Sequence, residues 1–167
     1  LAAAFADAAC RRGQRCLYFA FEESTSQIIR NMRSIGLDLA PHVKSGRLQY
    51  HVGRPTLFGL ETHLVTMYNA ITTFKPDVVI VDPVTDFTSV GTQAEVKSTL
   101  IRLIDFLKAN NVTALFTSLT DDARDPEQSA TDISSLIDTW ILLSNLEQAG
   151  ERTRGIYVLK SRGMSHS

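Results

Sequence analysis

Short apolar runs alternate along the chain with segments of helical periodicity, and this order of elements constrains the fold most. The alternation predicts right-handed βαβ units and a mostly parallel sheet. The last two runs lie close together in sequence and favour an antiparallel hairpin at one edge of that sheet. We therefore expect an α/β fold in which helices flank a mostly parallel, twisted sheet. The runs of strand length occupy residues 15–21, 47–52, 77–81, 112–118, 139–147 and 154–162.

Local signals mark the ends of the helices. Apolar residues recur at helical spacing before Gly13, and the pattern is already in mid-helix at Leu1, as though the helix began upstream. Ser24 followed by Gln27 is a capping box, which predicts that a second helix begins there and ends at Gly36. Further helical segments are expected at 37–43, 60–74 and 95–110.

Composition excludes several classes of protein. Of the 167 residues, 44% are hydrophobic and 21% are charged, which is typical of a globular protein. The formal net charge of −1 gives no basic excess for nucleic acid, and no apolar run approaches the roughly 18 residues that cross a bilayer. Cys10 and Cys16 fit neither a disulfide framework nor a zinc site. We expect one cytoplasmic domain, residues 1–167, with no membrane contact.

Asp82 ends an apolar run and is a candidate metal ligand. It follows four apolar residues, as in the Walker B pattern, where a carboxylate reaches a Mg²⁺ ion that bridges nucleotide phosphates. An aspartate in this position also commonly caps the turn after a strand. The spacing alone leaves both interpretations open.

Glu22 and Glu23 end another buried run and are candidate catalytic residues. Two adjacent carboxylates repel each other, which raises the pKa of one of them. Such a group suits the polarisation of a water or hydroxyl that attacks a γ-phosphate. The alternative is that both side chains only complement the dipole of the next helix.

Hydroxyl and cationic side chains mark three further places. Thr117 ends a strand, where a hydroxyl can sense a phosphate or simply border the core. Lys160 and Arg162 are predicted on one face of the last strand, where they would stabilise a transferring phosphoryl group of a neighbouring subunit or protect a solvated edge. Ser134 and Ser135 are either phosphoacceptors or helix-capping hydroxyls.

The phosphate-binding motif of NTPases is absent from these residues. The chain has no G-x-x-x-x-G-K-[ST], the loop whose backbone N–H groups and lysine hold the phosphates. In an NTPase this loop would immediately precede the helix that begins at Leu1. Either the loop lies upstream of these residues, or the chain is not an NTPase.

The order of motifs resembles the KaiC family, and the likeness spans essentially all 167 residues. Its strand, paired glutamates and helix correspond to residues 17–39, and its Walker B strand to 78–87. Its phosphorylation segment is similar to 131–143 and its closing hairpin to 150–166. The stretch 54–64 and the paired hydroxyls resemble the second, C-terminal ATPase domain of the family rather than the first. The chain would then begin just after the phosphate-binding loop.

This resemblance implies a RecA-like P-loop NTPase core in a homohexamer, with ATP and Mg²⁺ bound between subunits. The family's second domain phosphorylates and dephosphorylates an adjacent Ser/Thr pair and hydrolyses ATP, and KaiA-like and KaiB-like clock proteins are its implied partners. Carried over by position, the catalytic residues are Glu22 and Glu23, the Walker B carboxylate is Asp82, and the phosphoacceptors are Ser134 and Ser135. The residues implied to lie near the nucleotide are Lys160, Arg162 and Arg154.

Two other functions remain in competition with an autokinase. A RecA-like ATPase that handles DNA would have the same core, but the chain shows no evident basic or aromatic DNA-binding loop. A non-catalytic scaffold would use the fold only for assembly. For the 167 residues by themselves, without the phosphate-binding loop, we expect no measurable ATPase activity and a tendency to self-associate.

Overall fold

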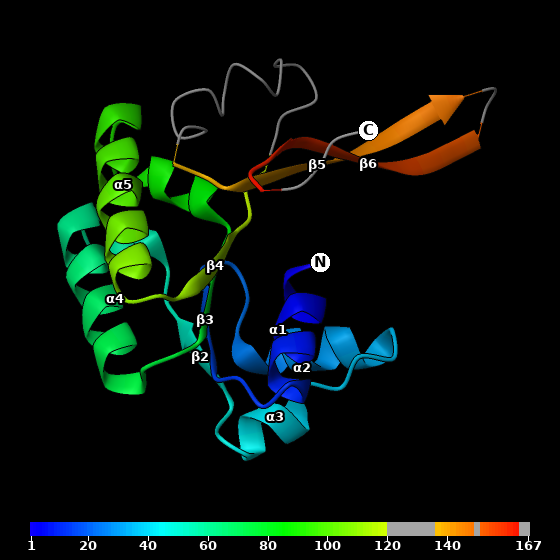
Figure 1. Cartoon of the computed structure of the whole chain (residues 1–167), viewed down its shortest axis with the longest axis horizontal. Helices are drawn as coiled ribbons and strands as arrows, with labels where there is room; N and C mark the ends of the chain where they lie inside the picture. The colour runs from blue at the N-terminus through cyan, green and yellow to red at the C-terminus, as the bar shows by residue number, and fades with distance from the viewer. Residues whose placement is uncertain (120–135, 149–150, 164–167) are drawn as a thin grey trace. The chain divides into compact units, whose positions relative to one another are not determined.

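The computed structural model describes residues 1–119, 136–148 and 151–163 (Figure 1). Contacts between Cα atoms divide the chain into two compact units, Leu1–Asp121 and Asp122–Ser167. The first unit contains the parallel sheet with its helices, and the second contains a hairpin.

A four-stranded parallel sheet forms the centre of the first unit. Its strands lie in the order β2-β1-β3-β4, and all three neighbouring pairs are parallel. This arrangement confirms the α/β class and the parallel sheet expected from the alternating pattern. The bounds are β1 (Cys16–Ala20), β2 (Leu48–Val52), β3 (Val78–Asp82) and β4 (Thr113–Phe116).

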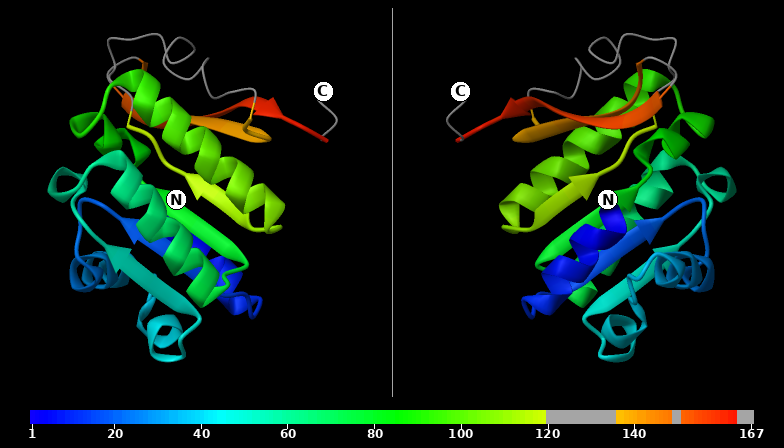
Figure 2. Two further views of the ribbon diagram at one scale, coloured as in Figure 1. Left: turned by 90° about the vertical axis from the view of Figure 1, so that its left-hand side faces the viewer. Right: turned by 90° about the vertical axis from the view of Figure 1, so that its right-hand side faces the viewer.

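Helices cover both faces of this sheet. Figures 1 and 2 show α1 on one face and α4 with α5 side by side on the other. Two 3₁₀ helices, η1 (Pro55–Leu57) and η2 (Val84–Ser89), were not expected from the sequence. The α-helices are α1 (Ala2–Arg11), α2 (Thr25–Ser34), α3 (Ala40–Lys44), α4 (Leu60–Phe74) and α5 (Gln93–Ala109).

Capping boxes begin two of the helices. The Ser24 side chain accepts a hydrogen bond from the Gln27 backbone, and the Gln27 side chain accepts one from the Ser24 backbone, as predicted. Thr92 and Glu95 form the same pair, so α5 begins two residues before the expected Glu95. Gly36 follows α2 with φ of +85°, a conformation that glycine adopts without strain.

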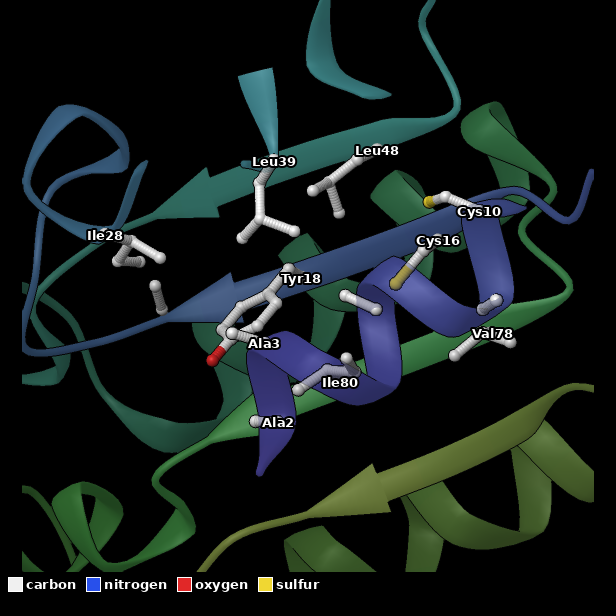
Figure 3. Packing of buried hydrophobic residues seen from close by; sticks show 13 residues of the cluster. Ala2, Ala3, Cys10, Cys16, Tyr18, Ile28, Leu39, Leu48, Val78 and Ile80 are labelled. Atoms are coloured by element: carbon white, nitrogen blue, oxygen red, sulfur yellow. The ribbon is translucent and has the colours of Figure 1, made fainter. Parts of the chain in front are cut away.

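Small side chains line the face of α1 that packs on the sheet (Figure 3). The α1 face is mostly alanine, and all of these alanines are at most 7% exposed. Because alanine projects little beyond the backbone, the helix leaves room for larger side chains that rise from β1 and β3. The side chains of these two strands are Cys16, Tyr18, Val78 and Ile80. Leu39 and Leu48 belong to the same buried cluster.

The opposite face of the sheet carries larger apolar side chains. Successive residues of a strand point to opposite faces, so Leu17, Phe19 and Val79 point away from α1, and each is fully buried. The core residues of α4 and α5 that cover this face include Leu64 and Leu103, which are also fully buried. Burial on both faces explains why the strands read as continuous apolar runs.

The second unit contains an antiparallel hairpin of β5 (Thr139–Gln148) and β6 (Glu151–Ser161). In the described residues these strands pair with each other, which confirms the predicted antiparallel hairpin. Its place at an edge of the parallel sheet stays a prediction. Ten register pairs join the two strands. Because they are adjacent in sequence and long, each strand finds its hydrogen-bond partners in the other.

No helix in the described parts of the chain combines the length and the apolarity needed to cross a membrane.

Candidate active site

Asp82, the last residue of β3, lies at the carboxyl end of the parallel sheet. Its carboxylate accepts one hydrogen bond from each neighbouring strand: the Tyr18 hydroxyl donates to Oδ2, and the Thr117 hydroxyl donates to Oδ1. The side chain remains partly exposed. Asp82 is therefore held in one orientation at the edge where ligands bind in open α/β sheets.

Thr117 reaches Asp82 because β4 continues past its last paired residue. The Thr117 N–H donates to the Val81 carbonyl at 3.0 Å, which extends the parallel ladder by one step. Its own carbonyl accepts from the Val84 N–H at 2.8 Å. The same residue thus orients the carboxylate and fixes the start of η2. The Thr117 hydroxyl thus lies beside Asp82, and its contact with a phosphate stays a prediction.

Tyr18 lies in the middle of β1 and is 3% exposed. Burial, followed by the hydrogen bond to Asp82 and the negative charge of that group, raises the pKa of the phenol far above its ordinary value. Tyr18 therefore remains a neutral donor at any physiological pH.

Aromatic packing fixes η2 against the end of the sheet. Phe87 of η2 is fully buried, and its ring centroid lies 4.9 Å from that of Phe21 and 5.9 Å from that of His63. Phe21 immediately precedes Glu22, and its N–H donates to the Asp82 carbonyl at 3.1 Å. These contacts place Glu22 and Asp86, which precedes Phe87, at the same edge as Asp82.

The surroundings of Glu22 favour the protonated form of its carboxyl. Partial loss of hydration raises the pKa of its carboxyl, and the negative charges of Asp86, Asp82 and Glu23 raise it further, in that order. Repulsion within the Glu22–Glu23 pair was the expected cause, but Glu23 contributes least. Desolvation and then the charge of Asp82 also raise the pKa of Asp86.

Glu23 points to a different partner. Its Oε1 accepts a hydrogen bond from Asn31 Nδ2 at 2.9 Å, so it contacts the body of α2. The two glutamates therefore have different surroundings. The charges of Asp86 and Asp82 act on Glu22, whereas Glu23 is hydrogen-bonded to α2.

Asp82 and Thr117 bring together oxygen atoms that could hold a Mg²⁺ ion. Within the described ranges, no three His, Cys, Asp or Glu side chains are gathered as a ready metal site. Mg²⁺ keeps several waters and binds through one or two carboxylates and the substrate phosphates. Asp82, partly exposed and next to the Thr117 hydroxyl, fits that requirement.

The predicted cations belong to the second unit. Lys160 pairs with Trp140 near the end of β6, and Arg154 pairs with Asn145. Arg162 lies one residue beyond β6, so the expectation that it belongs to the strand was wrong, although its N–H still donates to the Asp138 carbonyl at 2.8 Å. A turn follows Ser161.

The two candidate phosphoacceptors, Ser134 and Ser135, lie outside the described residues. The structure brings together Glu22, Asp82 and Thr117 from three separate segments of the first unit.

Two members of the site were missed in the sequence. Asp86 stands four residues after Asp82, and only an unexpected 3₁₀ helix returns it to the same edge. Tyr18 lies inside the apolar run at residues 15–21, from which only a buried strand is predicted. A tyrosine in a fully buried strand is nevertheless a signal, because its hydroxyl needs a hydrogen-bond partner in the interior.

Several known proteins are similar to this chain along nearly its whole length. The chain is 47% identical to the circadian clock protein KaiC2 of Synechocystis sp., over 100% of this chain and 30% of that protein. It is 40% identical to KaiC3 of the same organism, over 97% of this chain and 32% of the relative. It is 33% identical to the circadian clock oscillator protein KaiC of Thermosynechococcus vestitus, over 99% of this chain and 32% of that protein. The chain thus spans about a third of the length of these relatives.

The family described as "ATPase: KaiC" matches residues 1–167, the full length of the chain. This match confirms the resemblance seen in the motifs, and the parallel sheet with flanking helices is consistent with a RecA-like fold. The chain belongs to the KaiC family of ATPases.

Proposed function

We propose that this chain is the body of a Mg²⁺-dependent ATPase and autokinase that transfers the γ-phosphoryl group of ATP to its own serine pair. The observation that carries this proposal is the carboxyl edge of the sheet, where Asp82 is oriented by two hydroxyls and Glu22 has a raised pKa. Membership of the KaiC ATPase family supports the nucleotide as substrate.

Glu22 is the proposed general base. It accepts a proton from the attacking water or serine hydroxyl as the oxygen bonds to the γ-phosphorus and the bond to the β-phosphate oxygen breaks, releasing ADP. A carboxyl whose pKa is raised toward the working pH removes a proton more effectively than an ordinary glutamate. Glu23, bonded to Asn31, supports the position of Glu22.

Asp82 and Thr117 are the residues that would hold Mg²⁺. The ion, when bound, neutralises charge on the nucleotide phosphates. The chain's own contribution is an Asp82 carboxylate held in one orientation, so that little rearrangement is needed on binding.

Lys160, Arg162 and Arg154 are proposed to act on a nucleotide of the adjoining subunit in a homohexamer. Cations near the γ-phosphate stabilise the charge that spreads over its oxygens in the transition state. Arg162 Nη1 lies 3.4 Å from Asp138 Oδ1 with both side chains about half exposed, so this weak contact does not prevent a role toward a phosphate.

The relatives' names support a place in a circadian clock system. KaiA-like and KaiB-like proteins are the proposed partners. We propose the same class of role for the protein that carries this chain, in the cytoplasm.

Phosphate on Ser134 or Ser135 tests the autokinase directly. The protein joined to its phosphate-binding loop is incubated with Mg²⁺-ATP, and its intact mass is measured. We expect one or two added phosphates, none in the Ser134→Ala, Ser135→Ala double variant, and none in Asp82→Asn.

Subunit mixing separates transfer between subunits from transfer within one. Mixed rings of Glu22→Gln and Arg162→Ala subunits should regain phosphorylation if each site combines residues of two subunits. Absence of phosphate on the wild-type protein with a functional phosphate-binding loop would reject the autokinase.

A further inference from the structure

Tyr18 and Asp82 are brought together by the register of two parallel strands. Ala20 of β1 is the partner of Asp82, and Tyr18 is the partner of Ile80 two residues earlier. Because residues two apart in a strand share a face, Tyr18, Ala20 and Asp82 all point to the α1 face. Only a long side chain that leans along its strand spans this diagonal, and the Tyr18 hydroxyl reaches Asp82 Oδ2.

Small neighbours make the diagonal possible. Ala20, directly opposite Asp82, is 3% exposed and carries only a methyl group. Ala3 of α1 lies next to the Tyr18 ring in Figure 3 and is 7% exposed. Larger side chains at these positions would occupy the space of the Tyr18 ring. The small neighbours therefore allow its hydroxyl to reach the carboxylate.

We propose that Tyr18 is a positioning residue for the metal-binding carboxylate of Asp82, acting through its hydroxyl on the affinity of the site for the divalent cation of a nucleotide complex. This inference rests on the proposed function. Thr117 holds the other oxygen, so removal of the phenolic hydroxyl leaves Asp82 tethered on one side only. Loss of such an outer partner commonly costs about 10–100-fold in metal affinity or activity.

Tyr50 provides a matched control. It is the register partner of Tyr18 on β2, and the two ring centroids lie 5.1 Å apart. Its hydroxyl is buried, yet within the described part of the chain it has no hydrogen-bond partner. Removing the hydroxyl from either ring changes the same core by the same atom, but only Tyr18 touches the carboxylate.

Binding of Mn²⁺ tests the proposal without relying on turnover. The protein joined to its phosphate-binding loop is titrated with Mn²⁺ in the presence of a non-hydrolysable ATP analogue, and free Mn²⁺ is measured by electron paramagnetic resonance. For Tyr18→Phe we expect the dissociation constant to rise about tenfold. For Tyr50→Phe we expect a change of less than about twofold, and Asp82→Asn should lose most of the binding.

The outcomes separate this inference from the proposed function. If Asp82→Asn weakens Mn²⁺ binding while Tyr18→Phe behaves like Tyr50→Phe, the role of Tyr18 is refuted and the proposed function stands. If Asp82→Asn binds Mn²⁺ as tightly as the wild type, the metal site itself is refuted, and this inference with it.

A second measurement needs no variant. In protein labelled with carbon-13 at the tyrosine ζ carbon, addition of Mg²⁺ and the analogue should shift the Tyr18 resonance and leave that of Tyr50 in place. A Tyr18 resonance that does not move on saturation contradicts the proposal, whatever the folding of Tyr18→Phe.

Discussion

At the scale of single residues, the site contains several carboxyl groups whose negative charges act on one another. The carboxyls of Glu22 and Asp86 have raised pKa values, in part because each faces Asp82. Groups whose environment favours a bound proton are a mark of functional sites, because structural positions tend to relieve such repulsion. Glu23, the neighbouring glutamate, instead accepts a hydrogen bond from Asn31.

Replacing Glu22 by Gln should therefore not lower stability. A carboxyl with a raised folded-state pKa disfavours folding once the pH exceeds its unfolded value of about 4.3. We expect the melting temperature of Glu22→Gln at pH 7 to equal or exceed that of the wild type, and the difference to disappear below pH 4. A melting temperature several degrees lower at pH 7 would show that Glu22 stabilises the fold.

Asp7 shows the opposite behaviour. Burial alone would raise its pKa, but hydrogen bonds from His42 and Arg11 outweigh burial and lower it. The His42 Nε2 and Arg11 Nε atoms lie 2.9 and 2.8 Å from the two carboxylate oxygens, and the Asp7 side chain is only 10% exposed. Asp7 thereby connects α1 to α3.

Asp7→Asn should lower the free energy of unfolding by about 1–3 kcal/mol at pH 7, because charged hydrogen bonds are lost in a buried place. With a lowered folded-state pKa, the carboxylate stabilises the fold above its unfolded value near 3.9, and this contribution is lost as the pH falls through the lower folded value. Urea unfolding at pH 7 and at pH 3 measures both effects. Asp105→Asn, an exposed change of equal charge, should stay within about 0.5 kcal/mol; an equal loss in both variants would contradict the account.

At the scale of elements, local signals predicted more than long-range ones. The Ser24 capping box and the helix at 60–74 could be predicted because both depend on residues close in sequence. The 3₁₀ helix η2 could not, since burial of Phe87 against Phe21 and His63 stabilises it, and those contacts come from distant segments. The hairpin could be predicted as well, because its two strands are adjacent in sequence.

The Ser24 cap has a measurable effect on α2, the helix that follows the paired glutamates. Ser24→Ala removes the acceptor for the Gln27 N–H and should lower the free energy of unfolding by about 1 kcal/mol in urea. Ser34→Ala is the control at the other end of the same helix. Its hydroxyl donates to the Asn31 carbonyl, and alanine has the better helix propensity, so we expect a change within about 0.5 kcal/mol. Equal effects at both ends would argue against the cap.

At the scale of the whole molecule, the order of the motifs was enough to identify the family and the parallel α/β fold. The different contacts of the site residues could not be predicted from the order of the motifs alone. Glu22 and Glu23 are adjacent in sequence, and only three-dimensional packing shows that one faces Asp82 and the other Asn31. The contact of Tyr18 with Asp82 could not be predicted for the same reason, since the two residues are 64 positions apart in sequence.

The most direct test of the central claim, that the edge formed by Glu22 and Asp82 performs the chemistry, is ATP turnover by Glu22→Gln in the protein with its phosphate-binding loop. The affinity for ATP should change by less than about threefold, whereas turnover should fall by about 100-fold or more, because a general base acts on the chemical step. Glu23→Gln, which can still accept from Asn31, should keep substantially more activity. A Glu22→Gln protein that hydrolyses ATP at the wild-type rate would contradict the account.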